Sequence, residues 1–145
     1  MIYFDASFLV PFFLDEQSSR RVERFIRQQP QGEPAISQWT RIEFSSALAR
    51  QVRLGSLASD SALEIDFEFD AVMADSFVTV APAAGDFELS KQFLRRYETG
   101  LRAGDALHLA IASNHGARAI YSLDRGLLKA GQLLGLPVES GLRLA

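Results

Sequence analysis

Two aspartates follow short apolar segments in which an ionised side chain is unexpected. Asp5 comes directly after IYF near the N-terminus, and Asp124 comes directly after AIYSL. A turn-forming aspartate at the end of a strand explains either residue alone. If the two segments are neighbouring parallel strands, however, both carboxylates emerge at one edge of the sheet, where the functional sites of such folds lie.

Two further acids lie near expected helix starts. Glu43 follows Thr40 in capping-box spacing, and Asp105 begins the apolar segment GDALHLAIA. Helix capping explains each of them alone, because free N–H groups and the helix dipole favour a carboxylate there. The occurrence of four such acids in one small protein indicates a shared site.

Carboxylates that share a site require a partner of opposite charge. Four of them repel one another, so some must bind a proton unless a cation joins the group. The chain contains no cysteine. Oxygen ligands without cysteine or paired histidine favour Mg²⁺ or Mn²⁺ over Zn²⁺.

Short apolar strands alternate with helices along the chain and would position these acids. We expect strands at residues 2–4, 34–37, 76–82 and 119–123, with residues 138–140 adding an edge strand. An apolar helix should start soon after the first strand, and further helices are expected at residues 17–29, 40–55, 61–73, 86–97, 102–114 and 124–134. This alternation predicts an α/β fold with a parallel sheet and helices on both faces.

Composition limits the class of protein. With 145 residues, 48% of them apolar and 23% charged, the chain is expected to form a single domain over residues 1–145. The absence of cysteine excludes disulfide scaffolds, iron-sulfur clusters and thiol nucleophiles. The apolar start has no preceding basic residue and is interrupted by Asp5 and Pro11, so neither a signal peptide nor a membrane span is expected. We therefore expect a soluble, cytoplasmic protein.

The net charge of −3 and the pI of about 5.4 argue at first against a nucleic-acid partner. Arginine supplies 13 of the 15 basic residues, and its side chain binds phosphate with two parallel hydrogen bonds. An arginine-rich composition is also what a GC-rich genome produces. Without the four acids the net charge would be +1, so the acidic pI does not exclude RNA binding.

In its order of motifs the chain resembles the PIN domain, and more closely the VapC ribonuclease toxins of bacterial toxin-antitoxin pairs. The resemblance spans nearly the whole chain. Family members open with a hydrophobic strand that ends in Asp, followed by a small residue and then Ser or Asn. The other motifs are an acid on a helix in the second quarter, an acid that begins D-A-L-H-L-A, and Thr-x-Asp or Ser-x-Asp after a late strand. The matching residues here are Asp5 with Ser7, Glu43, Asp105, and Ser122 with Asp124.

Two departures from the family pattern concern the site. Ser122 stands where threonine is commoner, and His108 stands where some relatives have a further acid, one helical turn after Asp105. The second departure affects the expected set of metal ligands. We expect His108 to be a hydrogen-bonded structural histidine.

The resemblance implies a three-layer α/β/α fold with a central parallel sheet of four to five strands. It also implies an endoribonuclease that requires Mg²⁺ or Mn²⁺ and hydrolyses RNA phosphodiesters. The implied catalytic and metal-binding residues are Asp5, Glu43, Asp105 and Asp124. Glu43 would be a ligand or the group that orients the attacking water. Ser7, Ser122 and Arg102 would support these residues or contact phosphate, although a salt-bridged surface arginine is the alternative for Arg102.

The same resemblance implies partners. VapC-like toxins act on RNA, form homodimers, and are held inactive by a small antitoxin that covers the helices around the second acid. Phe67, Phe69 and Trp39 are candidates for such an interface, and core packing explains them equally well. A PIN nuclease outside toxin-antitoxin systems, or a non-catalytic PIN-like binding module, stays open as an alternative.

Two other classes are less consistent with the residues. A haloacid-dehalogenase-type phosphatase needs a second aspartate two residues after the first, and position 7 is Ser7. A response-regulator receiver domain needs a lysine after a late strand, and the segment AIYSLDRGL has none. Both readings therefore lack a residue that their chemistry requires.

Overall fold

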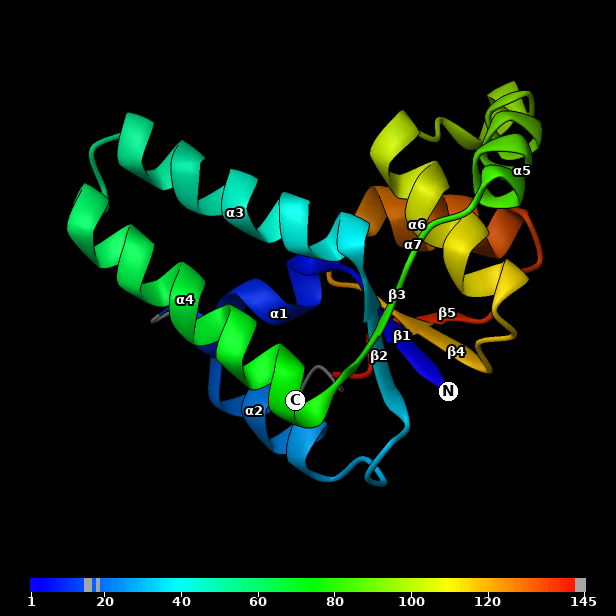
Figure 1. Cartoon of the computed structure of the whole chain (residues 1–145). Coiled ribbons are helices and arrows are strands. Elements are labelled where there is room, and N and C mark those ends of the chain that lie inside the picture. The colour runs from blue at the N-terminus through cyan, green and yellow to red at the C-terminus, as the bar shows by residue number, and fades with distance from the viewer. Residues whose placement is uncertain (15–16, 18, 143–145) are drawn as a thin grey trace.

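Short apolar strands form a parallel sheet at the centre of the computed structural model, which describes residues 1–14, 17 and 19–142. The sheet has five strands in the order β3-β2-β1-β4-β5, with every pair parallel (Figure 1). The strands are β1 (Ile2–Phe4), β2 (Pro34–Ser37), β3 (Val78–Val80), β4 (Ala119–Tyr121) and β5 (Val138–Glu139). The predicted parallel sheet and the predicted edge strand at residues 138–140 are confirmed.

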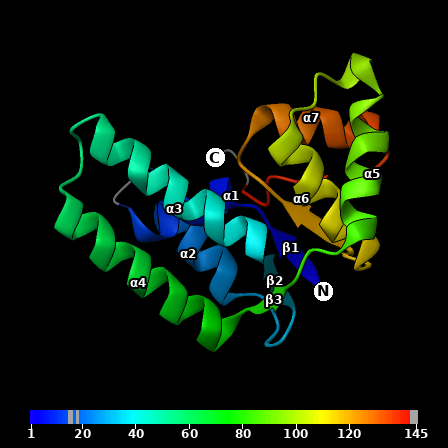
Figure 2. The ribbon, with the colours of Figure 1, turned by 45° about the horizontal axis from the view of Figure 1, so that its top comes forward.

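Helices cover both faces of this sheet. One layer contains α1 (Ala6–Phe13), α2 (Ser19–Arg27), α3 (Gln38–Arg53) and α4 (Ser59–Ser76) (Figure 2). The other layer contains α5 (Ala84–Leu94), α6 (Ala103–Asn114) and α7 (Arg125–Leu133). A 3-10 turn at Tyr97–Thr99 lies between α5 and α6 in the sequence. Successive residues of β1 point to opposite faces. Accordingly Phe4 packs in the first layer and Tyr3 in the second. The fold is the expected three-layer α/β/α arrangement.

Aromatic stacking fixes the long helical hairpin of α3 and α4 against α1. Phe44 and Phe69 stack face to face with ring centroids 3.8 Å apart, and Phe13 meets both rings edge-on. Phe69 therefore belongs to the core, as one of the two earlier explanations held. Within the described residues, no helix is long and apolar enough to cross a membrane.

Several helix starts differ from the predictions. In α3 the N-cap is Ser37, whose hydroxyl accepts from the backbone N–H of Thr40, so Thr40 is the third residue of the helix and not its cap. The predicted capping box of Thr40 with Glu43 is therefore wrong. The predicted start of α4 at residue 61 is also wrong, since the helix begins at Ser59 without a side-chain cap. For the predicted helix at 17–29, residue 18 lies outside the described residues.

The register between β1 and β4 positions the two aspartates that follow them. Phe4 pairs with Tyr121, and the backbone N–H of Asp5 donates to the carbonyl of Tyr121 at 3.2 Å. Asp5 and Ser122 consequently leave the sheet together at its carboxyl edge. The expectation that these two strands are neighbours is confirmed.

Candidate active site

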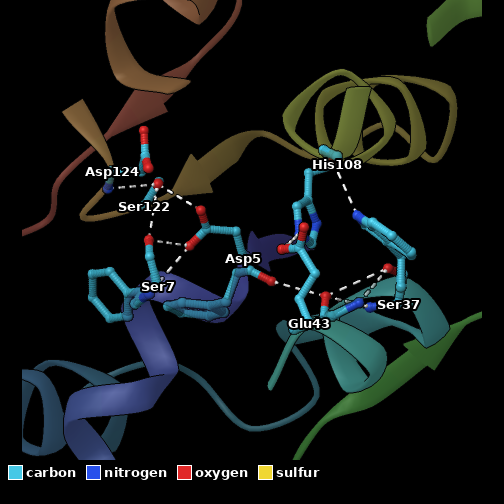
Figure 3. A network of polar contacts seen from close by, with 12 residues as sticks. Asp5, Ser7, Ser37, Glu43, His108, Ser122 and Asp124 are labelled. Carbon is cyan, nitrogen blue, oxygen red and sulfur yellow. Dashed lines mark hydrogen bonds and ion pairs between the residues drawn. The ribbon is translucent and has the colours of Figure 1, made fainter. Parts of the chain in front are cut away.

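Asp5 lies at the carboxyl edge of the sheet with only 3% of its surface exposed. Its Oδ1 accepts from the hydroxyl of Ser7 (2.7 Å) and from the backbone N–H of Phe8 (3.1 Å), and its Oδ2 accepts from the hydroxyl of Ser122 (2.6 Å) (Figure 3). The bond to Phe8 makes Asp5 the N-cap of α1. A carboxylate offers about four acceptor positions, so three donors leave one position for a further ligand.

Asp124 has a similar local role on the neighbouring strand. Its Oδ1 accepts from the N–H of Leu127 at 2.9 Å, which makes it the N-cap of α7. Its own N–H donates to Ser122 Oγ at 3.0 Å (Figure 3). Unlike Asp5, it is exposed. Helix capping therefore occupies one oxygen of Asp124 and leaves the other accessible.

Glu43 reaches the same edge from the second turn of α3. Its Oε2 lies 2.7 Å from Nε2 of His108, a fully buried residue on α6 (Figure 3). Nδ1 of His108 lies 2.7 Å from the hydroxyl of Tyr3. Glu43 does not cap its helix, so the capping explanation for this acid is excluded.

Asp105 can be compared with a second copy of its own local sequence. The tripeptide Ala-Gly-Asp occurs at the start of both α5 and α6, ending in Asp86 and Asp105 respectively. Asp86 is buried and accepts from the N–H of Ala83 (2.8 Å) and from the side chain of Asn114 (2.8 Å). Asp105 is half-buried and has no hydrogen-bond partner among the described residues. The same helix position thus supports a structural cap in one case and an unpaired carboxylate in the other.

The electrostatic environment shows that the four acids share one region. Burial, and after it the charges of Asp124, Asp5 and Glu43, together raise the pKa of Asp105 to about 6. Burial also raises the pKa of Asp5, against the opposing effects of His108 and the two serine hydroxyls. Repulsion among the carboxylates is therefore present in the folded protein.

The donor atoms that meet here are carboxylate oxygens, the ligands that Mg²⁺ and Mn²⁺ prefer. Among the described residues Asp105 accepts no hydrogen bond, and Asp124 and Glu43 accept one each, so these three side chains have the most unused acceptor capacity. Across the part of the chain that the structure describes, no three His, Asp or Glu side chains are arranged closely enough to hold an ion. The carboxylate oxygens are suitable ligands for a divalent cation, and a cation would relieve the repulsion between them. Binding of the cation would have to draw the four side chains closer together.

The supporting residues occupy the positions that the motifs indicate. Ser7 and Ser122 lie between the two strand ends, with 3.1 Å between their hydroxyl oxygens, and the N–H of Leu123 donates to Ser7 Oγ at 3.0 Å. Arg102 is the exposed N-cap residue of α6, three positions before Asp105. Among the described residues it forms no salt bridge, so the salt-bridge explanation for Arg102 finds no partner there.

The pairing of Tyr3 and His108 with Glu43 was not anticipated. His108 was correctly expected to be a hydrogen-bonded structural histidine, but its two partners were not identified. A signal was present in the sequence, because His108 lies one turn after Asp105 on the same helix face and Tyr3 lies on β1, two residues before Asp5.

Several solved structures share the fold of this chain. The sarcin-ricin-loop-cleaving toxin VapC20 of Mycobacterium tuberculosis superposes with a TM-score of 0.71 at 19% identity, covering 90% of this chain and 95% of that chain. A toxin-antitoxin complex from Klebsiella pneumoniae gives a TM-score of 0.66 at 18% identity, and the match covers 99% of this chain and 100% of that chain. VapBC2 of Rickettsia felis, bound to a promoter DNA fragment, gives a TM-score of 0.67 at 14% identity, and the match covers 96% of this chain and 98% of that chain. No curated protein matches by sequence.

These likenesses establish the fold, and the family model adds a match along the sequence itself. That model describes the PIN domain and matches residues 2–133. The matched region includes all four acids and the strands and helices that carry them. The chain therefore belongs to the PIN domain family.

Proposed function

We propose that this protein is a metal-dependent endoribonuclease that acts as the toxin of a VapBC-type toxin-antitoxin pair. The observation that carries the proposal is the convergence of four carboxylates from separate elements of the fold: Ser122 joins the strand ends that carry Asp5 and Asp124, and the charges of Asp124, Asp5 and Glu43 help burial to raise the pKa of Asp105. An arrangement that stores repulsion between acids is unfavourable for stability alone. It becomes favourable when a divalent cation joins the acids.

Each acid is assigned a role from its surroundings. Asp5, Asp105 and Asp124 would hold Mg²⁺ or Mn²⁺, directly or through water, and Glu43 would complete the ligand set or orient the attacking water. When bound, the ion supplies an activated water for in-line attack on a phosphodiester. Ser7 and Ser122 keep Asp5 in place through hydrogen bonds. Arg102, exposed beside Asp105, is available to contact a phosphate of the RNA.

The structural relatives support the choice of RNA and of a toxin role. One of them is described as a toxin that cleaves the sarcin-ricin loop, and others are toxin-antitoxin complexes. The match with this chain covers 95%, 100% and 98% of the length of these three proteins. A homodimer and a small cognate antitoxin are proposed on the same basis.

The outer face of α4 offers a surface for the antitoxin. Phe67 is 65% exposed and Leu63 is 56% exposed, four residues apart on one side of the helix. The helix carries six acidic residues and no basic one. Such a face suits a partner segment with apolar anchors and basic flanks. Trp39, by contrast, donates its indole N–H to the carbonyl of Gly104 at 3.1 Å and is explained by internal packing.

The test is RNA cleavage by the purified protein under metal control. After treatment with EDTA, the protein should leave bacterial tRNA and ribosomal RNA intact, and added Mg²⁺ or Mn²⁺ should restore cleavage at defined positions. The Asp5→Asn protein, purified in parallel, should be inactive. Any cleavage in that sample would therefore come from a contaminating ribonuclease. Cleavage that is indifferent to EDTA, or equal in Asp5→Asn, would overturn the assignment.

A second experiment separates a toxin from a PIN nuclease with another biological role. Induced expression of the wild-type chain should arrest bacterial growth, and coexpression of the product of the adjacent upstream reading frame should relieve the arrest. Metal-dependent cleavage in vitro without growth arrest, or arrest that the neighbouring product does not relieve, would favour the second role.

A further inference from the structure

His108 is a polar residue in the most buried part of an apolar helix. Its side chain is fully buried on α6, between Leu107 and Leu109 in the sequence, yet both ring nitrogens have partners. Burying two ring nitrogens is less favourable than burying a hydrocarbon side chain of similar volume. The position therefore calls for a reason other than stability, and its partners, Tyr3 and Glu43, suggest one.

The partners determine which ring nitrogen carries the proton. A carboxylate only accepts hydrogen bonds, so Nε2 of His108 donates to Glu43. In the neutral ring Nδ1 is then an acceptor, and the hydroxyl of Tyr3 must donate to it. The Tyr3 oxygen can accept from Ser37 at 2.8 Å, while Ser37 accepts from the N–H of Thr40 at 3.3 Å. With the ring neutral, the hydrogen bonds therefore run in one direction, from the start of α3 to the Glu43 carboxylate.

The second oxygen of Glu43 is confined from the other side. A Cβ atom placed on Gly104 would lie 2.7 Å from Glu43 Oε1 and 3.4 Å from the ring of Trp39. Trp39 in turn donates to the carbonyl of Gly104 and holds the start of α6 against α3. Glu43 thus has His108 at one oxygen and the bare backbone of Gly104 at the other.

We propose that His108 is a positioning residue that, together with Tyr3, holds the Glu43 carboxylate in the orientation required at the active site. This inference rests on the proposed nuclease function. A glutamate on a helix surface samples several rotamers, and ordering it during each catalytic cycle would cost conformational entropy. Contacts at both oxygens fix the carboxylate before the substrate arrives, which is how supporting residues contribute to catalysis.

NMR spectroscopy of the metal-free protein tests the pairing independently of activity. The chain contains two histidines, and His115 is exposed with only Nδ1 bonded, to the carbonyl of Ile111. His115→Gln therefore assigns the His108 ring signals in long-range ¹H–¹⁵N spectra. We expect a slowly exchanging proton on Nε2 of His108. Glu43→Gln should shift this proton and leave the backbone spectrum beyond α3 and α6 unchanged.

Kinetics then test the positioning role. The substrate is an oligoribonucleotide that spans a cut site mapped on the cleaved RNA. His108→Leu should lower kcat roughly 10- to 100-fold, as loss of a residue that orients a ligand does, with KM unchanged. His108→Gln retains an N–H near the position of Nε2 and should restore most of the rate. Tyr3→Phe should give an intermediate kcat, and the His115→Gln control should match the wild type.

The outcomes separate the inference from the function on which it rests. A His108→Leu protein that melts cooperatively and cleaves at the wild-type rate would overturn the positioning role. If His108→Leu does not fold, an unchanged kcat in Tyr3→Phe together with an unshifted Nε2 proton in Glu43→Gln would overturn it. If the wild type cleaves no RNA with any divalent ion while Glu43→Gln still shifts the His108 proton, the nuclease assignment fails and the pairing stands as structure alone.

Discussion

The hydroxyl of Ser122 donates a 2.6 Å hydrogen bond to Oδ2 of Asp5, joining residues that are 117 positions apart. The same hydroxyl oxygen accepts from the backbone N–H of Asp124. One small side chain thereby connects the ends of β1 and β4 and the two acids that follow them. The link requires the strands to be adjacent and parallel, so the site is assembled only when the sheet is complete.

Asp5→Asn is expected to abolish RNA cleavage without destabilising the protein. The amide removes a buried charge whose pKa is raised by desolvation, and the hydroxyl groups of Ser7 and Ser122 can rotate to accept from it. Cleavage assays and thermal melts of the metal-free protein check both parts. We expect cleavage at background level and a melting temperature equal to or above that of the wild type.

Asp86→Asn is the matched control for that substitution. Asp86 is equally buried but bonds to Ala83 and Asn114, away from the four acids. An amide there faces a donor and loses one hydrogen bond, which costs about 1 kcal/mol. The melting temperature should fall while specific activity is retained. If instead both variants lost activity and stability in parallel, Asp5 would be a structural residue only.

Mg²⁺ is expected to raise the melting temperature of the wild-type protein. An ion that binds only the folded state adds about 1 to 3 kcal/mol when present at 10 to 100 times its dissociation constant. Melts at increasing Mg²⁺ should shift upward and saturate for the wild type and for Asp60→Asn, which removes an exposed acid of α4. Asp105→Asn should show a much smaller shift. A shift of equal size in all three proteins would indicate nonspecific ion binding.

The placement of the acids could be predicted from the sequence because strand ends are local features. Apolar runs before Asp5 and Asp124 define two strands, and parallel topology then brings their carboxyl ends together. Glu43 was placed on the correct helix for the wrong local reason. Thr40 and Glu43 have the spacing of a capping box, but Ser37 ends β2 and caps α3 at once, which shifts the helix start by three residues.

Contacts between distant elements could not be predicted in the same way. A buried histidine and a buried tyrosine have many possible partners, and only the packing of α6 against α3 selects Glu43. The two Ala-Gly-Asp segments make the same point. Asp86 and Asp105 each end an Ala-Gly-Asp tripeptide at a helix start, yet one is a buried cap and the other accepts no hydrogen bond from the described residues.

Asp105 should make the stability of the metal-free protein depend on pH. Its pKa is about 6 in the folded state against an ordinary value of 3.8, so the folded state binds the proton more tightly than the unfolded state. This contribution to stability is fully present below pH 3.8 and is lost as the pH rises through 6. Because Asp105 is only half-buried, we discount the full linkage to about 1 to 2 kcal/mol.

Urea unfolding of the wild type and of Asp105→Asn between pH 4 and 8 measures this effect as the difference between their free energies of unfolding. The contributions of the other titrating groups cancel in that difference. Asp105→Asn should become the more stable protein as the pH rises, and saturating Mg²⁺ should reverse the order at pH 7.5. A difference that stays constant across the pH range would show that Asp105 does not titrate in the folded protein as its surroundings indicate.

Gly104→Ala tests whether the backbone beside Glu43 must stay bare. The added methyl group would lie 2.7 Å from Glu43 Oε1 and must displace the carboxylate, because His108 holds its other oxygen. A displacement of about 1 Å in an active site can lower the rate roughly 100-fold. Gly85→Ala is the matched control, since Gly85 occupies the same helix position in the other Ala-Gly-Asp segment and its methyl group would meet nothing closer than 4.0 Å. Both proteins should remain folded, with normal cleavage in Gly85→Ala alone, and equal cleavage rates would show that the Glu43 orientation is not critical.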